Sequence, residues 1–349
     1  MKENRFINAI KFIACLFVIT IHAPFPGEVG KIIGAVARFA VPFFFVVSGR
    51  FLLFRRDGSL ITEVPDIRRK TTRTLSRLLK TTGIVYLIHL LFSLFVQLKT
   101  GTPISEWFTS KFNLFEARNF FLFNSGQFIY DWTYTFDHMW FLFALIYVYG
   151  LICIFAPVLR KWYKGLIAIL LGFLFFGELL QTYYPIRPFD ISISTWYVMR
   201  NWLFVGIPFV MIGILFGDIV SKREKPFGKT EMTTGILLII IGIISVIAEL
   251  NLIGSKEVYL GSVIIVIGIL ILSECKIRVN DLLCNLGKRA SSRIYFFHVL
   301  VIALIDILSQ NGVIHAPSQA LKTVLVMGIC IILFYILPLL TNKLFTSRV

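Results

Sequence analysis

Hydrophobic residues in this chain gather into long windows separated by short polar segments, and this pattern predicts membrane-spanning helices. A helix needs about 20 mainly apolar residues to cross the ~30 Å hydrocarbon core of a bilayer. Ten windows fit, and their approximate bounds are Phe6 to His22, Arg38 to Phe54, Leu78 to Leu98, His138 to Pro157, Trp162 to Tyr184, Trp196 to Val220, Met232 to Leu252, Val258 to Ser273, Ile294 to Gln310 and Gln319 to Leu340. The sequence therefore predicts an all-α polytopic membrane protein with about ten transmembrane helices.

The composition supports this prediction, because 57% of the residues are hydrophobic and 35 are phenylalanine. Such a chain is too apolar for a soluble globular protein. The formal net charge of +16 is compatible with a nucleic-acid partner. The Lys and Arg residues lie mainly in short segments between the apolar windows, however, where membrane topology explains them. We therefore expect membrane lipids, and no nucleic acid, as partners.

The distribution of Lys and Arg also predicts the orientation of the chain. With ten helices both termini lie on one side, and the loops on that side, such as 55–80 and 276–293, hold most of the basic residues. The positive-inside rule then places both termini in the cytoplasm, with the chain in a bacterial-type cytoplasmic membrane. Residues 1–349 are predicted to form a single domain, and the abrupt end leaves a longer native polypeptide open. The five cysteines show no disulfide or metal-binding pattern, and we expect no metal.

Two ionisable residues, Lys11 and His22, lie in the first apolar window. Eleven residues of helix turn through about 1100° and rise ~16 Å, so both side chains project from one face. Ionisable residues inside a membrane usually face the bundle interior or a cavity and mark a substrate or proton path. Alternatively, Lys11 extends to the interface and His22 ends the helix before Pro24. The spacing alone leaves both interpretations open.

Basic residues follow at the end of the second window and in the segment after it. Ser48 and Gly49 permit close helix packing, whereas the guanidinium of Arg50 has the donor geometry that binds phosphate. One helical face of the next segment carries Arg69, Arg73, Arg77 and Lys80. Such a basic face binds either lipid headgroups or a polyphosphate ligand.

Asp137, His138 and Trp140 begin the fourth window, after a long aromatic-rich outer segment. An Asp-His pair orients a base or binds an acceptor, but a helix cap with an interfacial Trp is the simpler interpretation. The segment from Lys99 to Asp137 is long enough for a lid, or alternatively for an amphipathic helix in the outer interface.

Ser291, Tyr295 and His298 share one face of the ninth window, either lining a cavity or packing in the bundle. Other intramembrane polar residues line a cavity or pair with a basic group, and these are His89, Glu178, Glu249 and Asp306.

Several motifs follow one another in a fixed order along the chain. They are Lys11 with His22, VPFFFVVSG before Arg50, HMWFLFALIYVY from His138, NWLFVGIPFVMIGILFG from Asn201, and SSRIYFFH ending at His298. Together they resemble the acyltransferase-3 family of ten-helix membrane acyltransferases over essentially the whole chain. The family usually has Arg at the position of Lys11, and its third-helix arginines are three residues apart rather than four as in Arg73 and Arg77.

The resemblance implies transfer of an acyl group, commonly acetyl, from cytoplasmic acyl-CoA to a hydroxyl or amine acceptor at the outer side of the membrane. It implies that Lys11 and His22 are the essential pair, with His22 as general base, a role that suits the pKa of an imidazole. The donor-binding residues that it implies are Ser48, Arg50, Arg69, Arg73 and Arg77. The expected residues of the acceptor site or pore are Asp137, His138, Trp140, Glu178, Ser291, Tyr295 and His298.

Within the family, the chain is similar to the membrane half of the membrane-bound serine racemases of glycopeptide resistance. In those proteins a cytoplasmic racemase domain follows the membrane domain, so a fused racemase is an expected partner. The 349 residues contain no racemase motif. A second class of function follows, namely transport or binding of L-serine or a similar small amino acid that feeds the fused enzyme.

Overall fold

The computed structural model describes residues 3–55, 59–129, 136–183 and 200–346, which form helices and no strands. The all-α prediction is confirmed for these residues. Eight helical stretches within them are long and apolar enough, by length and composition, to cross a membrane. A further apolar helix, Leu260–Glu274, is shorter. The protein is therefore a multi-pass membrane protein.

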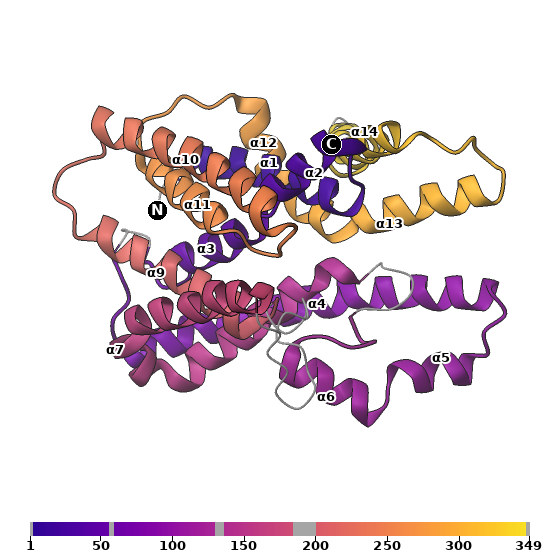
Figure 1. Ribbon diagram of the computed structural model, residues 1–349, viewed down its shortest axis with the longest axis horizontal. Helices are drawn as coiled ribbons and strands as arrows, with labels where there is room; N and C mark the ends of the chain where they lie inside the picture. The colour runs from indigo at the N-terminus through magenta and orange to yellow at the C-terminus, as the bar shows by residue number, and fades with distance from the viewer. Residues whose placement is uncertain (1–2, 56–58, 130–135, 184–199, 347–349) are drawn as a thin grey trace. The chain divides into compact units, whose positions relative to one another are not determined.

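The helices form two compact units, which are described one at a time (Figure 1). The central unit is Pro42–Glu224. The terminal unit joins the two ends of the chain, Lys2–Val41 and Lys225–Val349. Whether they act as the single domain predicted for 1–349 stays a prediction.

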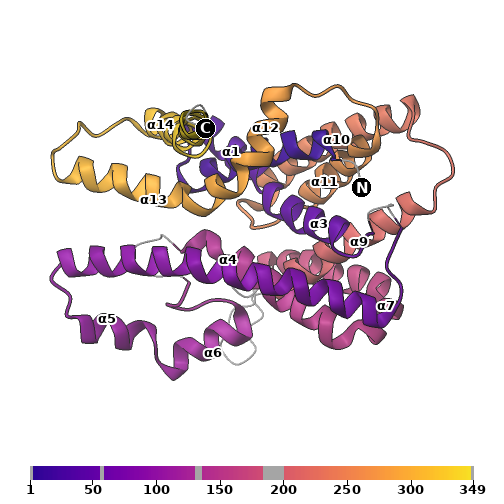
Figure 2. The same ribbon diagram turned by 180° about the vertical axis from the view of Figure 1, so that it is seen from behind.

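The central unit is built around α7, which packs against α4, η3 and α9. Figure 2 shows α5 running beside α4 in this unit. Its elements are α3 (Ala40–Leu52), which begins two residues before the unit, α4 (Val64–Lys99), α5 (Ile104–Lys111), α6 (Leu114–Phe123), η1 (Asp137–Met139), α7 (Trp140–Tyr183), η3 (Trp202–Gly206) and α9 (Ile207–Ser221).

Glycines let α3 and α9 pack backbone against backbone. A Cβ on Gly49 would lie 1.9 Å from the carbonyl oxygen of Val210, and one on Gly213 would lie 2.0 Å from that of Val46. No larger residue fits at such distances. The predicted close-packing role of the Ser48–Gly49 pair is thus confirmed for Gly49.

The predicted fourth and fifth helices meet at a kink within one element, α7. The prediction of a loop between them is therefore wrong. Phe155 has non-helical backbone angles (φ −99°, ψ 20°) two residues before Pro157, and the chain remains helical after this kink. Proline removes one backbone donor and kinks a helix without necessarily ending it. The predicted end at Tyr184 and the predicted start of the next helix at Trp196 lie outside the described residues.

At two other places the structure has a helix earlier in the sequence than we predict. The third, expected from Leu78, begins at Val64 with Pro65 in its first turn, so the basic segment is the start of α4 rather than a loop. The segment before Arg38 is also helical, as α2 (Gly27–Ala37) of the terminal unit. The start of α4 is rich in basic residues, and a search for long apolar runs does not detect it.

The terminal unit is built around α1 (Arg5–His22), which packs against helices from both ends of the chain. Its other elements are α2, α10 (Lys229–Ile253), α11 (Leu260–Glu274), α12 (Asp281–Arg289), α13 (Ser291–Gln310), α14 (Gln319–Ile331), η4 (Ile332–Ile336) and α15 (Leu337–Thr346). α10 and α11 lie side by side (Figure 1). Their contact is close, because a Cβ on Gly261 would lie 2.3 Å from the carbonyl oxygen of Gly242.

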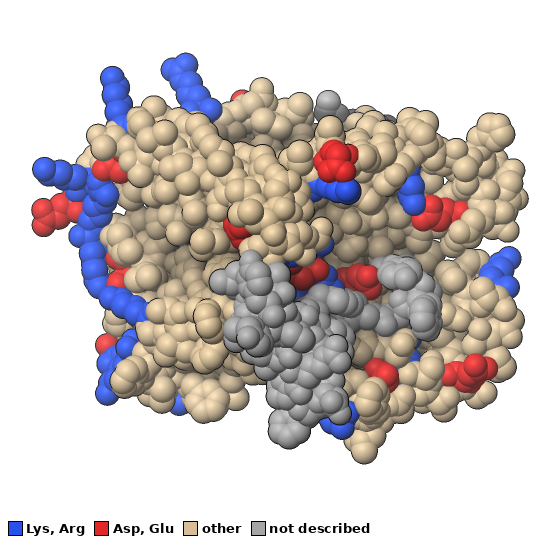
Figure 3. Space-filling model, viewed as in Figure 1, with Lys and Arg blue, Asp and Glu red and all other residues tan. Residues whose placement is uncertain are grey.

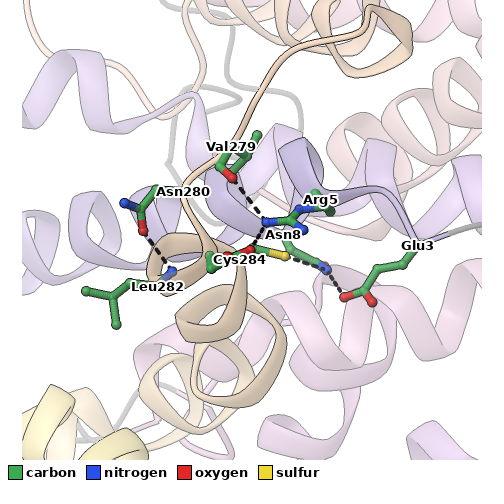
Figure 4. A network of polar contacts seen from close by, with 8 residues as sticks. Glu3, Arg5, Asn8, Val279, Asn280, Leu282 and Cys284 are labelled. Carbon is green, nitrogen blue, oxygen red and sulfur yellow. Dashed lines mark hydrogen bonds and ion pairs between the residues drawn. The ribbon is translucent and has the colours of Figure 1, made fainter.

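Polar contacts fix the start of α1 against α12 (Figure 4). Arg5 forms an ion pair with Asp281 and donates to the carbonyl oxygen of Val279 at 3.1 Å. Asn8 donates to Glu3 at 2.8 Å. A Cβ on Gly287 would lie 1.6 Å from the carbonyl oxygen of Asn8, so α12 crosses α1 at backbone contact.

Large hydrophobic side chains are exposed along the longest helices of both units. Leu87, Leu91 and Phe95 are more than half exposed on α4, and Ile244 is 61% exposed on α10. Most of the face in Figure 3 is likewise uncharged. Apolar surface of this extent suits contact with lipid.

Candidate active site

His22 and His298 are brought together in the terminal unit, although they are far apart in the sequence. Their ring centroids are 5.2 Å apart with an interplanar angle of 56°. His22 is the last residue of α1 and is half-buried, whereas His298 is fully buried in α13. A half-buried imidazole beside a buried one is a plausible geometry for a base with a fixed neighbour.

A second contact shows that α1 and α13 run in the same direction. The thiol of Cys15 donates to the carbonyl oxygen of Ser291 at 3.2 Å, and His22 contacts His298 seven residues further along both helices. Ser291 itself donates to the carbonyl oxygen of Gly287 at 2.5 Å. The register of the two helices therefore sets the histidine pair.

The hydrogen bonds of His298 determine which ring nitrogen carries its proton. Nδ1 lies 3.1 Å from the carbonyl oxygen of Ile294 and 2.9 Å from that of Tyr295. Carbonyl oxygens only accept, so Nδ1 is the donor and the neutral ring has its lone pair on Nε2. The ring of Tyr295 lies 6.3 Å from that of His298, and both residues are buried.

A cavity of about 340 Å³ lies beside the end of α1. Ile21 and Pro24, on either side of His22 and Ala23, line it together with Arg38, Lys256 and Tyr259. The hydroxyl of Thr323 in α14 donates to the carbonyl oxygen of Ala23 at 2.8 Å and holds this end of α1 in place. His22 itself is not among the residues that line this cavity.

Lys11 lies half-buried on α1, eleven residues before His22. The helix places the two Cα atoms ~16 Å apart. The two side chains therefore do not act on the same reacting atom. They contact one ligand only if that ligand is long enough to span the distance.

Arg50, a predicted donor-binding residue, is buried in the central unit among aromatic rings. Its guanidinium carbon lies 4.9 Å from the ring centroid of Phe54, 5.6 Å from that of Phe51 and 6.0 Å from that of Phe216. Cation–π contacts of this kind stabilise a desolvated Arg. Ser48 donates to the carbonyl oxygen of Phe44 at 2.8 Å. The donor-binding roles of Arg50 and Ser48 stay predictions.

Arg69, Arg73 and Arg77 lie exposed on the first half of α4. Arg69 forms an ion pair with Asp66 at 2.7 Å. The shared basic face therefore exists on one helix, as the spacing predicts.

Asp137, His138 and Trp140 lie at the start of α7 in the central unit. Asp137 is the first residue of the short helix η1, whose N-cap is Phe136 and which has no side-chain cap hydrogen bond, so the prediction that Asp137 caps the helix is wrong. His138 is 2% exposed, with its ring centroid 5.1 Å from that of His89. Trp140 is 5% exposed, 5.8 Å from Phe45 between ring centroids, so the prediction of an interfacial Trp is wrong.

A buried lysine covers this second histidine pair. Lys111 of α5 is 3% exposed, donates to the carbonyl oxygen of Gln127 at 3.0 Å, and lies 4.6 Å from the ring centroid of Phe136. Trp107 donates to the hydroxyl of Ser93 at 3.3 Å. Nothing in the sequence pattern indicates this burial, because a lone Lys in an outer segment is usually solvated.

Two of the remaining acidic residues have structural partners. Glu249 accepts from the backbone N–H groups of Leu260 and Gly261 at 3.0 and 2.9 Å, at the N-terminus of α11. Asp306 pairs with Lys322 at 2.6 Å and links α13 to α14. Glu178 lies within α7, and its side chain is outside the described part of the chain.

Sequence reasoning missed the basic residues in the middle of α7. Arg160, Lys161 and Lys164 line a cavity of about 800 Å³ in the central unit, together with Lys222 of the segment after α9. Their charge was attributed to topology alone. A clue is the nearby Pro157, because a kink opens space between helices.

Comparison with protein families gives one match. Residues 4–342 match the acyltransferase 3 model, described as an acyltransferase domain. No curated protein and no solved structure matches the chain. The match covers nearly the whole chain and includes both units and the pair His22 and His298. The chain therefore belongs to the acyltransferase 3 family and is a membrane acyltransferase.

Proposed function

We propose that the protein transfers an acetyl group from cytoplasmic acetyl-CoA, or another acyl group from its CoA thioester, to a hydroxyl or amine acceptor at the outer side of the membrane. His22 is the general base. The observation that carries this proposal is the contact of His22 with His298 at the end of α1, beside a cavity.

The reaction needs one proton acceptor and one leaving group. His22 takes the proton of the acceptor's hydroxyl or amine while its oxygen or nitrogen attacks the carbonyl carbon of the thioester. The new ester or amide bond forms as the carbon–sulfur bond breaks. The proton on His22 then passes to the CoA thiolate, so the imidazole returns neutral.

His298 is a positioning residue for His22 in this scheme. Its Nδ1 is held by the carbonyl oxygens of Ile294 and Tyr295, so its own ring is fixed. A fixed ring 5.2 Å away limits the orientations open to His22.

Basic side chains other than His22 bind the donor's phosphates in this scheme. Lys11 lies ~16 Å deeper along α1, which suits a contact with the extended CoA chain rather than with the thioester. Ser48, Arg50, Arg69, Arg73 and Arg77 are the other proposed donor-binding residues. Ser291 and Tyr295 of the terminal unit, and Asp137, His138, Trp140 and Glu178 of the central unit, stay predicted residues for the acceptor or the pore.

We also propose ten crossings with both termini in the cytoplasm of a bacterium. The 44 residues of α7 would extend ~66 Å if straight, about twice the ~30 Å hydrocarbon core, so the two halves on either side of Phe155 make separate crossings. The short α11 makes another crossing. This topology places the basic segments 55–80, 160–164 and 276–293 on the cytoplasmic side.

Purified protein in nanodiscs tests the proposal directly. Labelled acetyl-CoA is supplied with simple hydroxyl and amine acceptors, and thioester loss is measured for wild type and His22→Ala. The matched control is His315→Ala, because His315 is exposed in the segment between α13 and α14. We expect turnover that His22→Ala abolishes and His315→Ala retains. Full activity of His22→Ala would overturn the role of His22.

The alternative is binding or transport of L-serine for a fused C-terminal racemase in glycopeptide resistance. The intramembrane acids Glu249 and Asp306 have partners within the terminal unit and so give this alternative no support. Binding of labelled L-serine by the same nanodiscs, without any thioester loss, would favour this alternative.

A further inference from the structure

A cavity in the central unit is lined by none of the residues that the family resemblance assigns to the donor. It has a volume of about 800 Å³ and lies between the segment after α3, the start of α4, the kinked middle of α7 and the end of α9. Small-molecule sites typically measure about 300–1,000 Å³. Arg69, Arg73 and Arg77 do not line this cavity.

The floor of the cavity is apolar and fixed. Leu53, Ile67, Ile152, Met211 and Ile214 line it, and each is at most 7% exposed. Four different parts of the chain supply these side chains, which are already packed. A floor of this kind accommodates an alkyl, acyl or other apolar arm without rearrangement.

The rim of the cavity is basic. Arg160, Lys161, Lys164 and Lys222 line it, against the two carboxylates Glu63 and Asp218. Arg160 donates to the carbonyl oxygen of Thr62 at 2.9 Å, which orients its guanidinium without neutralising it. Lys222 is paired with Asp218 at 2.8 Å. Within the described part of the chain, Lys161 and Lys164 form no ion pair.

The position of the rim suits a ligand from the membrane interface. Trp162, between the two lysines, is 66% exposed, and tryptophan is enriched at the level of the lipid headgroups. The excess of Lys and Arg in such segments is typical of the cytoplasmic side. A ligand seated here meets apolar walls at depth and ammonium groups at the surface.

We propose that this cavity binds a ligand that carries a phosphate on an apolar arm, with Lys161 and Lys164 contacting the phosphate. Ammonium groups form strong charge-assisted hydrogen bonds with phosphate oxygens. Two sources share this chemistry, namely the nucleotide end of acyl-CoA and the headgroup of an anionic phospholipid. The first source rests on the proposed acyl transfer, and the second does not.

The test compares three proteins in nanodiscs: wild type, Lys161→Glu/Lys164→Glu, and the control Lys276→Glu/Arg278→Glu. The control makes the same charge change at exposed residues on the proposed cytoplasmic side of the terminal unit. Acetyl-CoA affinity is measured in neutral phosphatidylcholine, with dephospho-CoA as competitor. Retention of phosphatidylglycerol is measured by mass spectrometry from mixed nanodiscs. The pair Lys161→Arg/Lys164→Arg checks that charge, and not folding, is responsible.

We expect the charge reversal at Lys161 and Lys164 to weaken the binding of one of the two ligands by about tenfold or more. The control variant and the arginine variant should bind both ligands as wild type does. Weaker acetyl-CoA binding identifies the donor as the occupant, and loss of phosphatidylglycerol alone identifies a lipid. Wild-type binding of both ligands by the reversal variant overturns the cavity site. Wild type that turns over no acetyl-CoA overturns the proposed function, and the lipid measurement still decides the cavity.

Discussion

Each unit of the protein contains a pair of neighbouring histidines with tilted rings, and the two pairs have similar geometry but different surroundings. The ring centroids of His22 and His298 are 5.2 Å apart, and those of His89 and His138 are 5.1 Å apart. His22 ends a helix beside a cavity and is half-buried. His89 and His138 are 0% and 2% exposed, below a segment that buries Lys111.

The comparison teaches that access, rather than ring spacing, distinguishes a catalytic imidazole from a packing one. A general base must reach the proton that it removes. His22 is partly exposed at the end of α1, as such a base needs to be. The pair in the central unit has aromatic cover from Phe136, whose ring centroid lies 5.9 Å from that of His89. We therefore expect His22 to matter for turnover and His89 for stability.

The largest expected effect separates the two pairs by turnover. His22→Gln should lower the rate of acetyl-CoA consumption by about 10²–10⁴-fold, the range for loss of general acid–base catalysis. His89→Gln should change the rate per folded molecule less than twofold, as a rough estimate, because His89 contacts no reacting group. Rates are measured in nanodiscs and normalised to folded protein. A larger fall in His89→Gln than in His22→Gln would reverse the comparison.

A smaller effect concerns the helices that hold His22 and His298 in contact. Gly287→Ala should destabilise the protein by about 1–3 kcal/mol, because the new methyl group overlaps the carbonyl oxygen of Asn8. α12 leads directly into α13 and His298, so turnover should fall as well.

Gly328→Ala is the matched control for this change. A Cβ on Gly328 in α14 meets nothing within 4 Å, and Ala favours helix by up to ~1 kcal/mol. Thermal unfolding in detergent should therefore show a lower midpoint for Gly287→Ala and an unchanged or higher one for Gly328→Ala. Equal midpoints for the two variants would argue against backbone contact between α1 and α12.

The pair in the central unit should reveal its role through stability. His89→Gln should cost about 1–3 kcal/mol, since it disturbs polar groups that are buried below α5 and near Ser93. His315→Gln, at an exposed position, should leave the unfolding midpoint unchanged. If both variants unfold as wild type does, His89 does not contribute to the packing of the central unit.

Alkylation with a water-soluble maleimide sharpens the difference in access. In a background without Cys153 and Cys275, which are partly exposed, His22→Cys should react and His89→Cys should not, because its site is fully buried. Labelling is measured by mass spectrometry of intact protein. Equal labelling of His22→Cys and His89→Cys would show that the two sites do not differ in access to solvent.

The smallest effect is a pH dependence at Cys275, after the end of α11. Burial raises the pKa of this thiol, and the carboxylates of Glu231 and Glu274 raise it further. The thiolate is the reactive form, so alkylation should accelerate only at a higher pH than for an ordinary cysteine. Glu274→Gln removes one negative charge and should shift the rate profile toward lower pH. An identical profile in the variant would exclude that electrostatic contribution.

Much of the fold follows from the apolar windows of the sequence. The long runs of α1, α10 and α13 are helices near their predicted bounds, because a polypeptide in hydrocarbon satisfies its backbone only within such elements. The failures occur where polar residues extend a helix, as at Val64, or where a proline kinks one, as at Pro157. Hydropathy does not distinguish a kink from a loop.

The site was less predictable, because it depends on contacts between distant segments. The spacing of Lys11 and His22 predicts a functional face of α1, yet no local pattern pairs His22 with a residue 276 positions away. The sequence also does not predict the basic lining of the cavity in the central unit. Membrane topology already explains these charges, so their pattern does not indicate a cavity.

The most direct test of the central role of His22 is chemical rescue. His22→Gly in nanodiscs is supplied with acetyl-CoA, an acceptor and increasing concentrations of imidazole, and acetylated product is measured. We predict that the variant is inactive alone and that imidazole restores turnover in proportion to the concentration of its neutral form, because it replaces the missing base beside His298. Wild-type turnover of His22→Gly without imidazole would contradict the proposal.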